Sequence, residues 1–365
     1  MKYTVDKNKN ESSYIQLYRQ IKNDIVKGNY RYGARLPSKR LISEETGVSV
    51  ITVEHAYAIL CDEGYAEAKP RRGYFAAYRE KDFLSVGDIG SYRRIKTITH
   101  LNTENTFPFS VLAKTMRRII SDQRENIMVK SPNKGCDELR EAISMYLARS
   151  NGMTVTPDQI IIGSGAEYLY TLTVQLLGRK NVFGTEDPCY DKINRVYETC
   201  GVQYRRLRMG RDGIITDDLK NTDATILHVT PFNSFPSNVT ATASKKKEYL
   251  LWAKERQGYI VEDNFDSELT VSSKAEDTLF SLDSNGHVIY VNTFSKTLAP
   301  SMRVGYMVLP QKLLPIFDEK IGFFSCTVPV FEQYTLAELI NNGDFERHIN
   351  RVRRERRKLK IKSDS

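Results

Sequence analysis

Four side chains near residue 300 have the types and the spacing of a site for an aldehyde that carries a phosphate. Thr293 and Ser295 precede Lys296, and a loop then leads to Arg303. A partly desolvated lysine amine can lose its proton and form a Schiff base with an aldehyde. Two hydroxyls and a planar, permanently charged guanidinium group suit a phosphate. Pyridoxal 5′-phosphate combines an aldehyde with a phosphate arm, so it fits this set of residues.

A short buried strand is expected to position these side chains. Residues 288–291 (VIYV) form an apolar run that is typical of a strand covered on both faces. The polar residues follow directly, so we expect them at the carboxyl end of the strand, where open α/β sheets bind ligands. The plain alternative is a surface lysine in a Ser/Thr turn.

The string TFSKTLAPSMRVGY (293–306) resembles the cofactor-lysine signature of fold-type I aminotransferases. The resemblance implies that Lys296 is the catalytic lysine and holds pyridoxal 5′-phosphate as an internal aldimine. The surrounding segment alternates short apolar strands with helical stretches, which is the pattern of an α/β domain. We therefore predict a large domain with the α/β, PLP-dependent transferase-like fold.

A glycine-rich turn offers a second part of the same site. Ser164, Gly165 and Ala166 lie between an expected strand at 159–162 and an expected helix at 168–177. Such a turn presents backbone N–H groups to an anion. By the resemblance, this turn binds the phosphate of the cofactor together with Thr293, Ser295 and Arg303.

Two further motifs supply residues for the ring of the cofactor. EDPCY resembles the family's ExPxY, which implies that Tyr190 stacks on the pyridine, although a core tyrosine is the alternative. EDNFD follows an apolar strand and resembles EDDY, which implies that Asp263 pairs with the pyridine nitrogen and keeps it protonated. Phe265 replaces the tyrosine of that motif.

A third motif lies in the loop between these two. TPFNSFPSN resembles TPxHQxPxG, with Asn238 in place of the glycine, and asparagine tolerates positive φ.

The N-terminal residues predict a helix-turn-helix followed by a β-hairpin. Apolar residues recur at helical spacing from Tyr14 to Ile25, and Ser38 and Ser49 are good N-caps for two further helices separated by Gly47. Two short strands are expected around KPRRG (69–73). This order resembles the winged helix-turn-helix (α+β) of the GntR family.

That resemblance implies a set of DNA contacts. The N-terminal end of the recognition helix should enter the major groove, and the wing tip should reach the backbone or the minor groove. The plain alternative for the wing arginines is a solvated face. The residues expected to contact DNA are Arg35, Ser38, Arg40, Ser49, Thr52, Arg71, Arg72 and Gly73.

Composition sets the class of protein and the compartment. The net charge of +9 is concentrated at the ends, with +4 in residues 1–80 and +6 in residues 346–365, so nucleic acid is a natural partner. The five cysteines are scattered, which favours a reduced, cytoplasmic protein without a metal site. The sequence has no long, uncharged apolar run of the kind that predicts a membrane span, and the polar N-terminus does not resemble a signal peptide.

The joined pattern resembles the MocR subfamily of GntR-family regulators. Its members sense pyridoxal phosphate, or an amine or amino acid through it, and dimerise through the large domain. The predicted layout is a winged helix-turn-helix at 8–78, a linker at 79–97, a large domain at 98–345 and a basic helical tail at 346–365. We expect this tail to begin a C-terminal subdomain that the chain otherwise lacks.

Three functions remain open. The first is a homodimeric, DNA-binding transcriptional regulator that senses the cofactor, or an amine or amino acid effector. The alternative is a PLP-dependent aminotransferase with an attached DNA-binding domain. The third is a large domain that serves only as a scaffold. The arginine that binds the substrate carboxylate in the family has no counterpart here, which favours a regulator over an enzyme.

Overall fold

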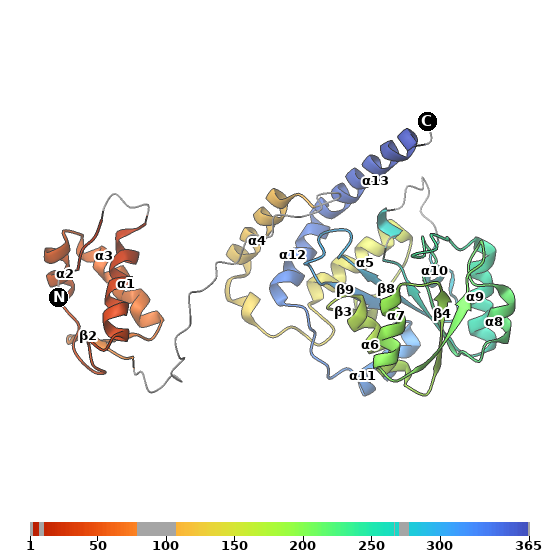
Figure 1. Ribbon diagram of the computed structural model, residues 1–365, viewed down its shortest axis with the longest axis horizontal. Coiled ribbons are helices and arrows are strands. Elements are labelled where there is room, and N and C mark those ends of the chain that lie inside the picture. Colours follow the sequence, from red (N-terminus) through yellow and green to blue (C-terminus); the bar gives the residue numbers. More distant parts are fainter. Residues whose placement is uncertain (1–2, 7–10, 79–106, 266, 270–276, 364–365) are drawn as a thin grey trace. The chain divides into compact units, whose positions relative to one another are not determined.

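The computed structural model describes residues 3–6, 11–78, 107–265, 267–269 and 277–363. The chain divides into two compact units, residues 1–100 and 101–365 (Figure 1). The predicted linker at 79–97 lies outside the described residues. No helix in the described part of the chain is long and apolar enough to cross a membrane.

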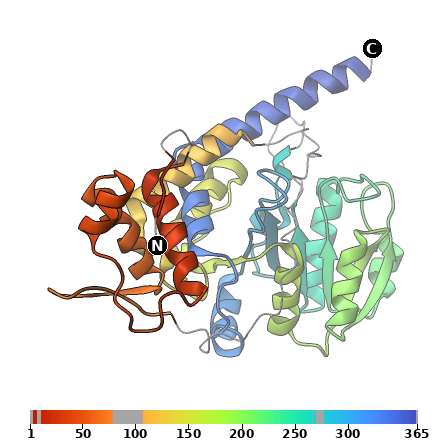
Figure 2. The same cartoon turned by 60° about the vertical axis from the view of Figure 1, so that its left-hand side comes forward.

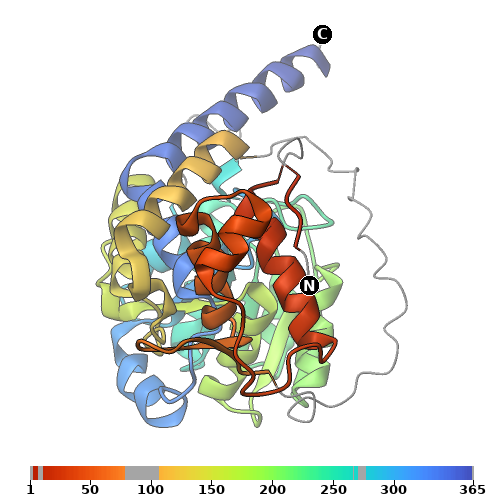
Figure 3. The ribbon, with the colours of Figure 1, turned by 90° about the vertical axis from the view of Figure 1, so that its left-hand side faces the viewer.

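The N-terminal unit is a winged helix-turn-helix, as predicted. Serine hydroxyls cap two of its helices: Ser38 Oγ accepts the N–H of Leu41 at 3.2 Å, and Ser49 Oγ accepts the N–H of Thr52 at 3.1 Å. Gly47 ends the first of these helices in the left-handed region, at φ 66°. The elements are α1 (Ser13–Val26), α2 (Lys39–Thr46), α3 (Val50–Asp62), β1 (Ala66–Lys69) and β2 (Gly73–Ala76) (Figure 3).

One apolar core joins the three helices to the hairpin. Leu17 and Ile21 of α1 pack with Val53 and Tyr57 of α3, and all four are fully buried. The ring of Tyr57 stacks on Tyr74 of β2, with centroids 4.2 Å apart. The hairpin, whose two strands form an antiparallel ladder, is therefore held against α3 by side-chain packing.

The large unit is built on a seven-stranded, mostly parallel sheet (Figure 1). The strand order is β3-β9-β8-β7-β6-β4-β5, and only the two ladders that β9 forms are antiparallel. Because β4, β6, β7 and β8 run in one direction, their carboxyl ends lie along one edge. The strands are β3 (Ile160–Gly163), β4 (Val182–Asp187), β5 (Gln203–Arg208), β6 (Ile226–Val229), β7 (Tyr259–Asp263), β8 (Val288–Thr293) and β9 (Gly305–Val308).

Helices cover both faces of this sheet. One face packs against α6 (Ala166–Leu177), α7 (Asp191–Thr199) and α11 (Leu314–Lys320). The other packs against α5 (Asp137–Asn151) and α12 (Val330–Asn341) beside β3, and against α8 (Thr216–Asn221), α9 (Ala243–Glu255) and α10 (Leu279–Leu282) farther along. The remaining helices are α4 (Phe109–Gln123), α13 (Asp344–Ser363) and the short 3₁₀ turns η2 (Arg124–Met128), η3 (Pro157–Gln159), η4 (Ser267–Leu269) and η5 (Gln311–Leu313).

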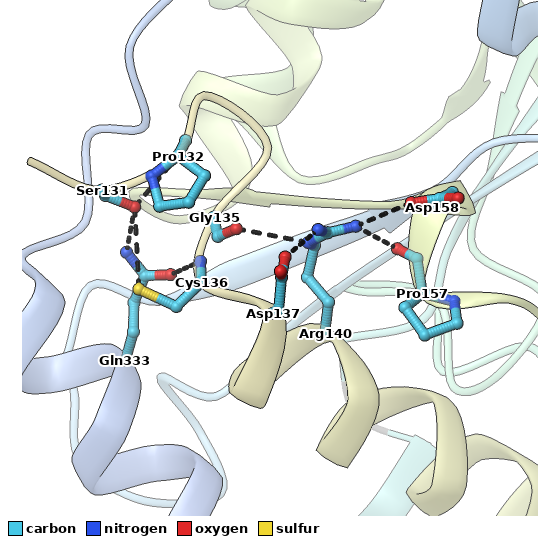
Figure 4. Close-up of polar contacts among 9 residues, drawn as sticks. All are labelled: Ser131, Pro132, Gly135, Cys136, Asp137, Arg140, Pro157, Asp158 and Gln333. Atoms are coloured by element: carbon cyan, nitrogen blue, oxygen red, sulfur yellow. Dashed lines mark hydrogen bonds and ion pairs between the residues drawn. The ribbon is translucent and has the colours of Figure 1, made fainter.

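The loop before α5 supports β3, which leads into the predicted phosphate turn. Gly135 lies so close to β3 that a Cβ atom on it would be 2.4 Å from Cγ1 of Ile162. The fully buried Gln333 of α12 fixes this loop: Oε1 accepts the N–H of Cys136 at 2.7 Å, and Nε2 donates to Ser131 Oγ at 3.0 Å (Figure 4). Nε2 also donates to the carbonyl of Val328 at 2.8 Å.

A buried arginine holds the start of α5 in the same region. Arg140 donates from Nε to the carbonyl of Gly135 at 3.2 Å and from Nη1 to the carbonyl of Pro157 at 2.8 Å, and it forms ion pairs with Asp137 and Asp158 (Figure 4). These contacts of Arg140 connect the loop, α5 and η3 next to β3.

The basic segment at 346–365 falls on α13, which runs past the other helices of the large unit (Figures 1 and 2). Near its middle, Arg353 donates from Nε to the carbonyl of Glu268 at 2.6 Å, and Arg356 donates from Nη1 to the carbonyl of Leu269 at 3.2 Å. The expectation that this helix begins a further subdomain stays a prediction.

Candidate functional site

A pocket of about 300 Å³ lies at the carboxyl ends of the parallel strands, where the sequence predicts a ligand. Seven of the nine predicted cofactor residues line it: Tyr190, Ala166, Asp263, Thr293, Ser295, Lys296 and Arg303. Four lining residues were not predicted as ligands, namely Glu167, Tyr170, Phe235 and Phe265. Ser164 and Gly165 do not line the pocket directly.

Asp263 is a buried carboxylate at the end of β7, with 2% of its surface exposed. Its Oδ2 accepts the phenol of Tyr170 and lies 3.7 Å from Nε2 of His228. Its Oδ1 is buried and has no hydrogen-bond partner among the described residues. Burial, reinforced by the negative charge of Asp263, raises the pKa of Tyr170 well above its ordinary value, so this phenol stays a donor. An orphaned carboxylate oxygen that is buried beside a pocket fits a ligand that brings its own donor.

Lys296 follows β8, the strand next to β7, and also lines the pocket. Its Nζ lies 4.0 Å from the ring centroid of Phe265, which is cation–π distance. The sequence predicts a partly desolvated lysine, but the residue is exposed. β8 itself is buried along its whole length, as predicted, so the strand holds Lys296 at the edge of the pocket without enclosing it.

Arg303 lies at the N-terminus of α6, where it is engaged by an acidic side chain. Its Nη2 donates to Oε2 of Glu167 at 2.7 Å. The guanidinium lies so close to Gly165 that a Cβ atom there would be 2.6 Å from Nη2, and Gly165 has φ +95°. The positive φ favours glycine at this position, and a larger side chain there would also displace the end of the arginine.

Glu167 also accepts a hydrogen bond from Lys192, whose Nζ lies 2.9 Å from Oε1. Burial by itself would raise the pKa of Glu167, but the hydrogen bonds from Lys192, from its own backbone N–H and from Arg303 outweigh it and lower the pKa to about 2. Glu167 is therefore anionic at neutral pH. It binds the same kinds of donor that a phosphate needs, so this corner of the pocket is built for an anion.

Contacts within the protein hold parts of the predicted phosphate site in place. Ser295 Oγ donates to the carbonyl of Met302 at 3.4 Å, and Thr293, at the last position of β8, is 7% exposed. The N–H of Ser164 donates to Oγ1 of Thr327 at 3.1 Å. The turn before α6 is thus held by a residue 163 positions later in the chain.

Two aromatic rings stand at the mouth of the pocket. Tyr190 and Phe235 are 37% and 54% exposed, and their centroids are 6.4 Å apart in an edge-to-face arrangement. The buried carboxyl group of Glu186 links the two segments, because it accepts hydrogen bonds from the hydroxyl of Ser234 at 2.6 Å and from the N–H of Thr230 at 3.0 Å. Asn238, at the end of this loop, has the positive φ of 55° that the sequence predicts.

Most of the predicted DNA contacts are at the surface of the N-terminal unit. Arg35, Arg40 and the wing residues Arg71 and Arg72 are exposed. Arg35 lies beside the wing, because a Cβ atom on Gly73 would be 3.6 Å from its Nε. Ser38, Ser49 and Thr52 take part in capping, and the hydroxyls of Ser49 and Thr52 lie 2.8 Å apart. Capping and groove contact are compatible, because a hydroxyl that accepts one bond retains a donor.

Sequence reasoning missed the residues that surround the predicted ones. Glu167 follows Ala166 directly, and an acidic residue in the first turn of a helix was a readable signal for an anion-binding end. Tyr170 and His228 carried no local signal, because their contact with Asp263 joins three separate elements. Among the described residues, no cluster of His, Cys, Asp or Glu side chains could hold a metal ion.

Two family models match the chain. The model of aminotransferase class I and II matches residues 99–365, and the model of bacterial regulatory proteins of the gntR family matches residues 13–75.

Two curated relatives match along nearly the whole chain. YdeL of Bacillus subtilis, an uncharacterized HTH-type transcriptional regulator, is 34% identical over 94% of this chain and 77% of its own length. The probable rhizopine catabolism regulatory protein MocR of Rhizobium meliloti is 28% identical over 96% of this chain and 76% of its own.

Among solved structures, the kynurenine aminotransferase of Pyrococcus horikoshii in complex with PMP matches with a TM-score of 0.62 and 26% identity. The match covers 68% of this chain but only 64% of that enzyme. This confirms the predicted fold of the large unit.

Proposed function

The chain belongs to the GntR-type transcriptional regulators that carry a class I and II aminotransferase domain, and we propose that it is a DNA-binding regulator whose large unit binds pyridoxal 5′-phosphate. The family membership supports the regulator. The proposal that it binds the cofactor rests on the residues that line the pocket.

The orphaned Oδ1 of Asp263 is the observation that carries the cofactor proposal. A buried carboxylate oxygen without a donor is costly unless a ligand supplies one, and a protonated pyridine nitrogen is such a donor. The same pocket presents the amine of Lys296 and the guanidinium of Arg303. When bound, pyridoxal phosphate supplies a reactive aldehyde and an electron-withdrawing ring.

Each predicted residue has a proposed role in holding the group. Asp263 accepts the pyridine N–H, Lys296 offers its amine to the aldehyde, and Tyr190 covers one face of the ring. The phosphate is held by the remaining set: Ser164, Gly165, Ala166, Thr293, Ser295 and Arg303.

DNA binding is proposed to use the α3 end of the N-terminal unit. Ser49 and Thr52 stand at the start of α3, the part of a recognition helix that reaches base edges. Arg35, Ser38, Arg40, Arg71, Arg72 and Gly73 would contact the phosphate backbone or the grooves beside it. Two such units in a homodimer would read two half-sites.

Regulation is proposed to follow the occupancy of the pocket. The cofactor, or an amine or amino acid that reacts with it, would favour one arrangement of the two units, since a ligand shifts an equilibrium only through its different affinity for the two states. The spacing of the paired DNA-binding units would then match or miss the operator.

The visible absorption spectrum of the full chain with added pyridoxal phosphate tests the cofactor proposal. We expect a band that free pyridoxal phosphate does not have in the wild type and in Lys130→Ala, which removes an exposed lysine outside the pocket. In Lys296→Ala only the absorption of the free compound should remain. Equal spectra for the two lysine variants would refute the role of Lys296. Operator binding measured with and without the cofactor then tests the regulation.

A further inference from the structure

Glu167, the second residue of α6, places a carboxylate among the donors that we assign to the phosphate. Oε2 accepts Arg303 at 2.7 Å and Oε1 accepts Lys192 at 2.9 Å. The carboxylate also accepts the N–H of its own residue, in the first turn of the helix. These are the partners of an anion bound at a helix N-terminus, and here the anion is part of the chain.

A phosphate at this place would meet a charge of its own sign. The low pKa of Glu167, about 2, keeps the carboxylate ionised at neutral pH, and a phosphate monoester carries nearly two negative charges there. Both groups need Arg303, whose guanidinium is already close-packed against Gly165. The two anions therefore cannot both have the full use of this arginine.

We propose that Glu167 is a built-in competitor for the phosphate of the cofactor, which makes cofactor binding reversible and lets the protein respond to cofactor concentration. This inference rests on the proposed function, since it concerns the same pocket. It differs from a purely structural role, in which Glu167 would only cap α6 and its removal would affect stability but not phosphate affinity.

Lys192 is a second cationic partner for the carboxylate of Glu167. It comes from α7 and donates to Oε1, whereas Arg303 donates to Oε2, and its Nζ lies 5.8 Å from the ring centroid of Tyr190. When Arg303 turns to a phosphate, Lys192 can keep hold of Glu167 and neutralise it. Lys192 is thus a positioning residue that acts through Glu167.

Titration calorimetry of the full chain with pyridoxine 5′-phosphate tests the competition. This probe has the ring and the phosphate but no aldehyde, so its binding does not depend on the amine of Lys296. We expect Glu167→Gln to bind it about fivefold more tightly than the wild type at low salt, which is the scale of one partly exposed ion pair. The advantage should shrink as salt screens the charges.

Asp191→Asn is the matched control. Asp191 is an exposed carboxylate on α7 that pairs with Arg195 at 2.6 Å, so its removal changes the net charge equally without touching the N-terminus of α6. We expect its affinity for the probe to equal that of the wild type. Equal tightening in both variants would show a general charge effect and overturn the competition.

Other outcomes separate the two proposals. If the wild type gives the absorption band with pyridoxal phosphate but Glu167→Gln binds the probe no more tightly, the competition is wrong and the cofactor proposal stands. If no variant binds either compound, both are wrong. If Glu167→Gln alone binds, the competition holds and is stronger than we infer.

A double-mutant cycle tests the part played by Lys192. Lys192→Gln should weaken binding of the probe in the wild type, but much less in the Glu167→Gln background, because there is then no carboxylate to hold aside. The same loss in both backgrounds would mean that Lys192 binds the phosphate directly and would refute its positioning role.

Discussion

Replacing Glu186 by glutamine should change how the stability of the large unit depends on pH. Glu186 is 3% exposed at the end of β4. Burial raises its pKa from 4.5 to about 8, and the hydrogen bonds from Ser234 and Thr230, which lower it, offset only part of this. The folded chain therefore holds a proton that the unfolded chain releases.

The sign follows from this proton. Because the folded pKa is the higher one, the stabilising contribution is fully present below about pH 4.5 and is lost as the pH rises through about 8. The free energy of unfolding should fall by about 1.4 kcal/mol for each pH unit in this window. Over the whole window the loss amounts to about 4 to 5 kcal/mol from this one group.

Glutamine at 186 keeps the shape of the side chain and is neutral at every pH. Its carbonyl can accept the N–H of Thr230, and its amide can donate to the hydroxyl of Ser234. We therefore expect Glu186→Gln to match the wild type near pH 5 and to become progressively more stable above it. The loop that contains Phe235 should become more stable over the same pH range.

Urea unfolding followed by the fluorescence of Trp252 measures the effect. The chain has one tryptophan, and it lies in the core of the large unit, so its signal reports that unit. Glu262→Gln is a parallel variant, since burial raises the pKa of Glu262 to about 7, and its advantage should level off about one pH unit earlier. A difference between Glu186→Gln and the wild type that stays constant from about pH 5 to about pH 9 would refute the reasoning.

Three further changes have defined outcomes. Replacing Arg71 and Arg72 together by alanine should weaken DNA binding at every sequence and lower the slope of log affinity against log salt by about 2, measured by fluorescence anisotropy. Gln333→Leu should destabilise the large unit by about 2 to 4 kcal/mol, because it leaves the N–H of Cys136, before α5, and the carbonyl of Val328, before α12, without this partner; urea unfolding gives the value. Tyr170→Phe should cost about 1.5 to 3 kcal/mol by removing the donor to Asp263, and added pyridoxal phosphate should recover part of the loss. If Gln333→Leu or Tyr170→Phe were as stable as the wild type, the hydrogen-bond network that contains that residue would not contribute to stability as we argue.

The parts of the site that follow a strand or a cap were readable from the sequence. An apolar run such as 288–291 fixes a buried strand, so the residues that come directly after it must lie at its carboxyl end. Ser38 and Ser49 are caps for the same local reason, since a hydroxyl reaches the N–H three residues ahead in any helix that starts there. The positive φ of Asn238 is also local, because few residue types tolerate it.

The arrangement of those residues with respect to one another was decided by the tertiary structure. Tyr170 reaches Asp263 across 93 positions, and Arg303 reaches Glu167 across 136. Neither contact has a periodic or short-range signature, because each depends on the order of the strands and on the face that α6 covers. The exposure of Lys296 likewise depends on what packs around the end of β8. The sequence determined by itself which chemical groups stand at the end of each element; packing decided which of them meet, because charge pairs and buried donors form between side chains that only the folded sheet brings within hydrogen-bond distance.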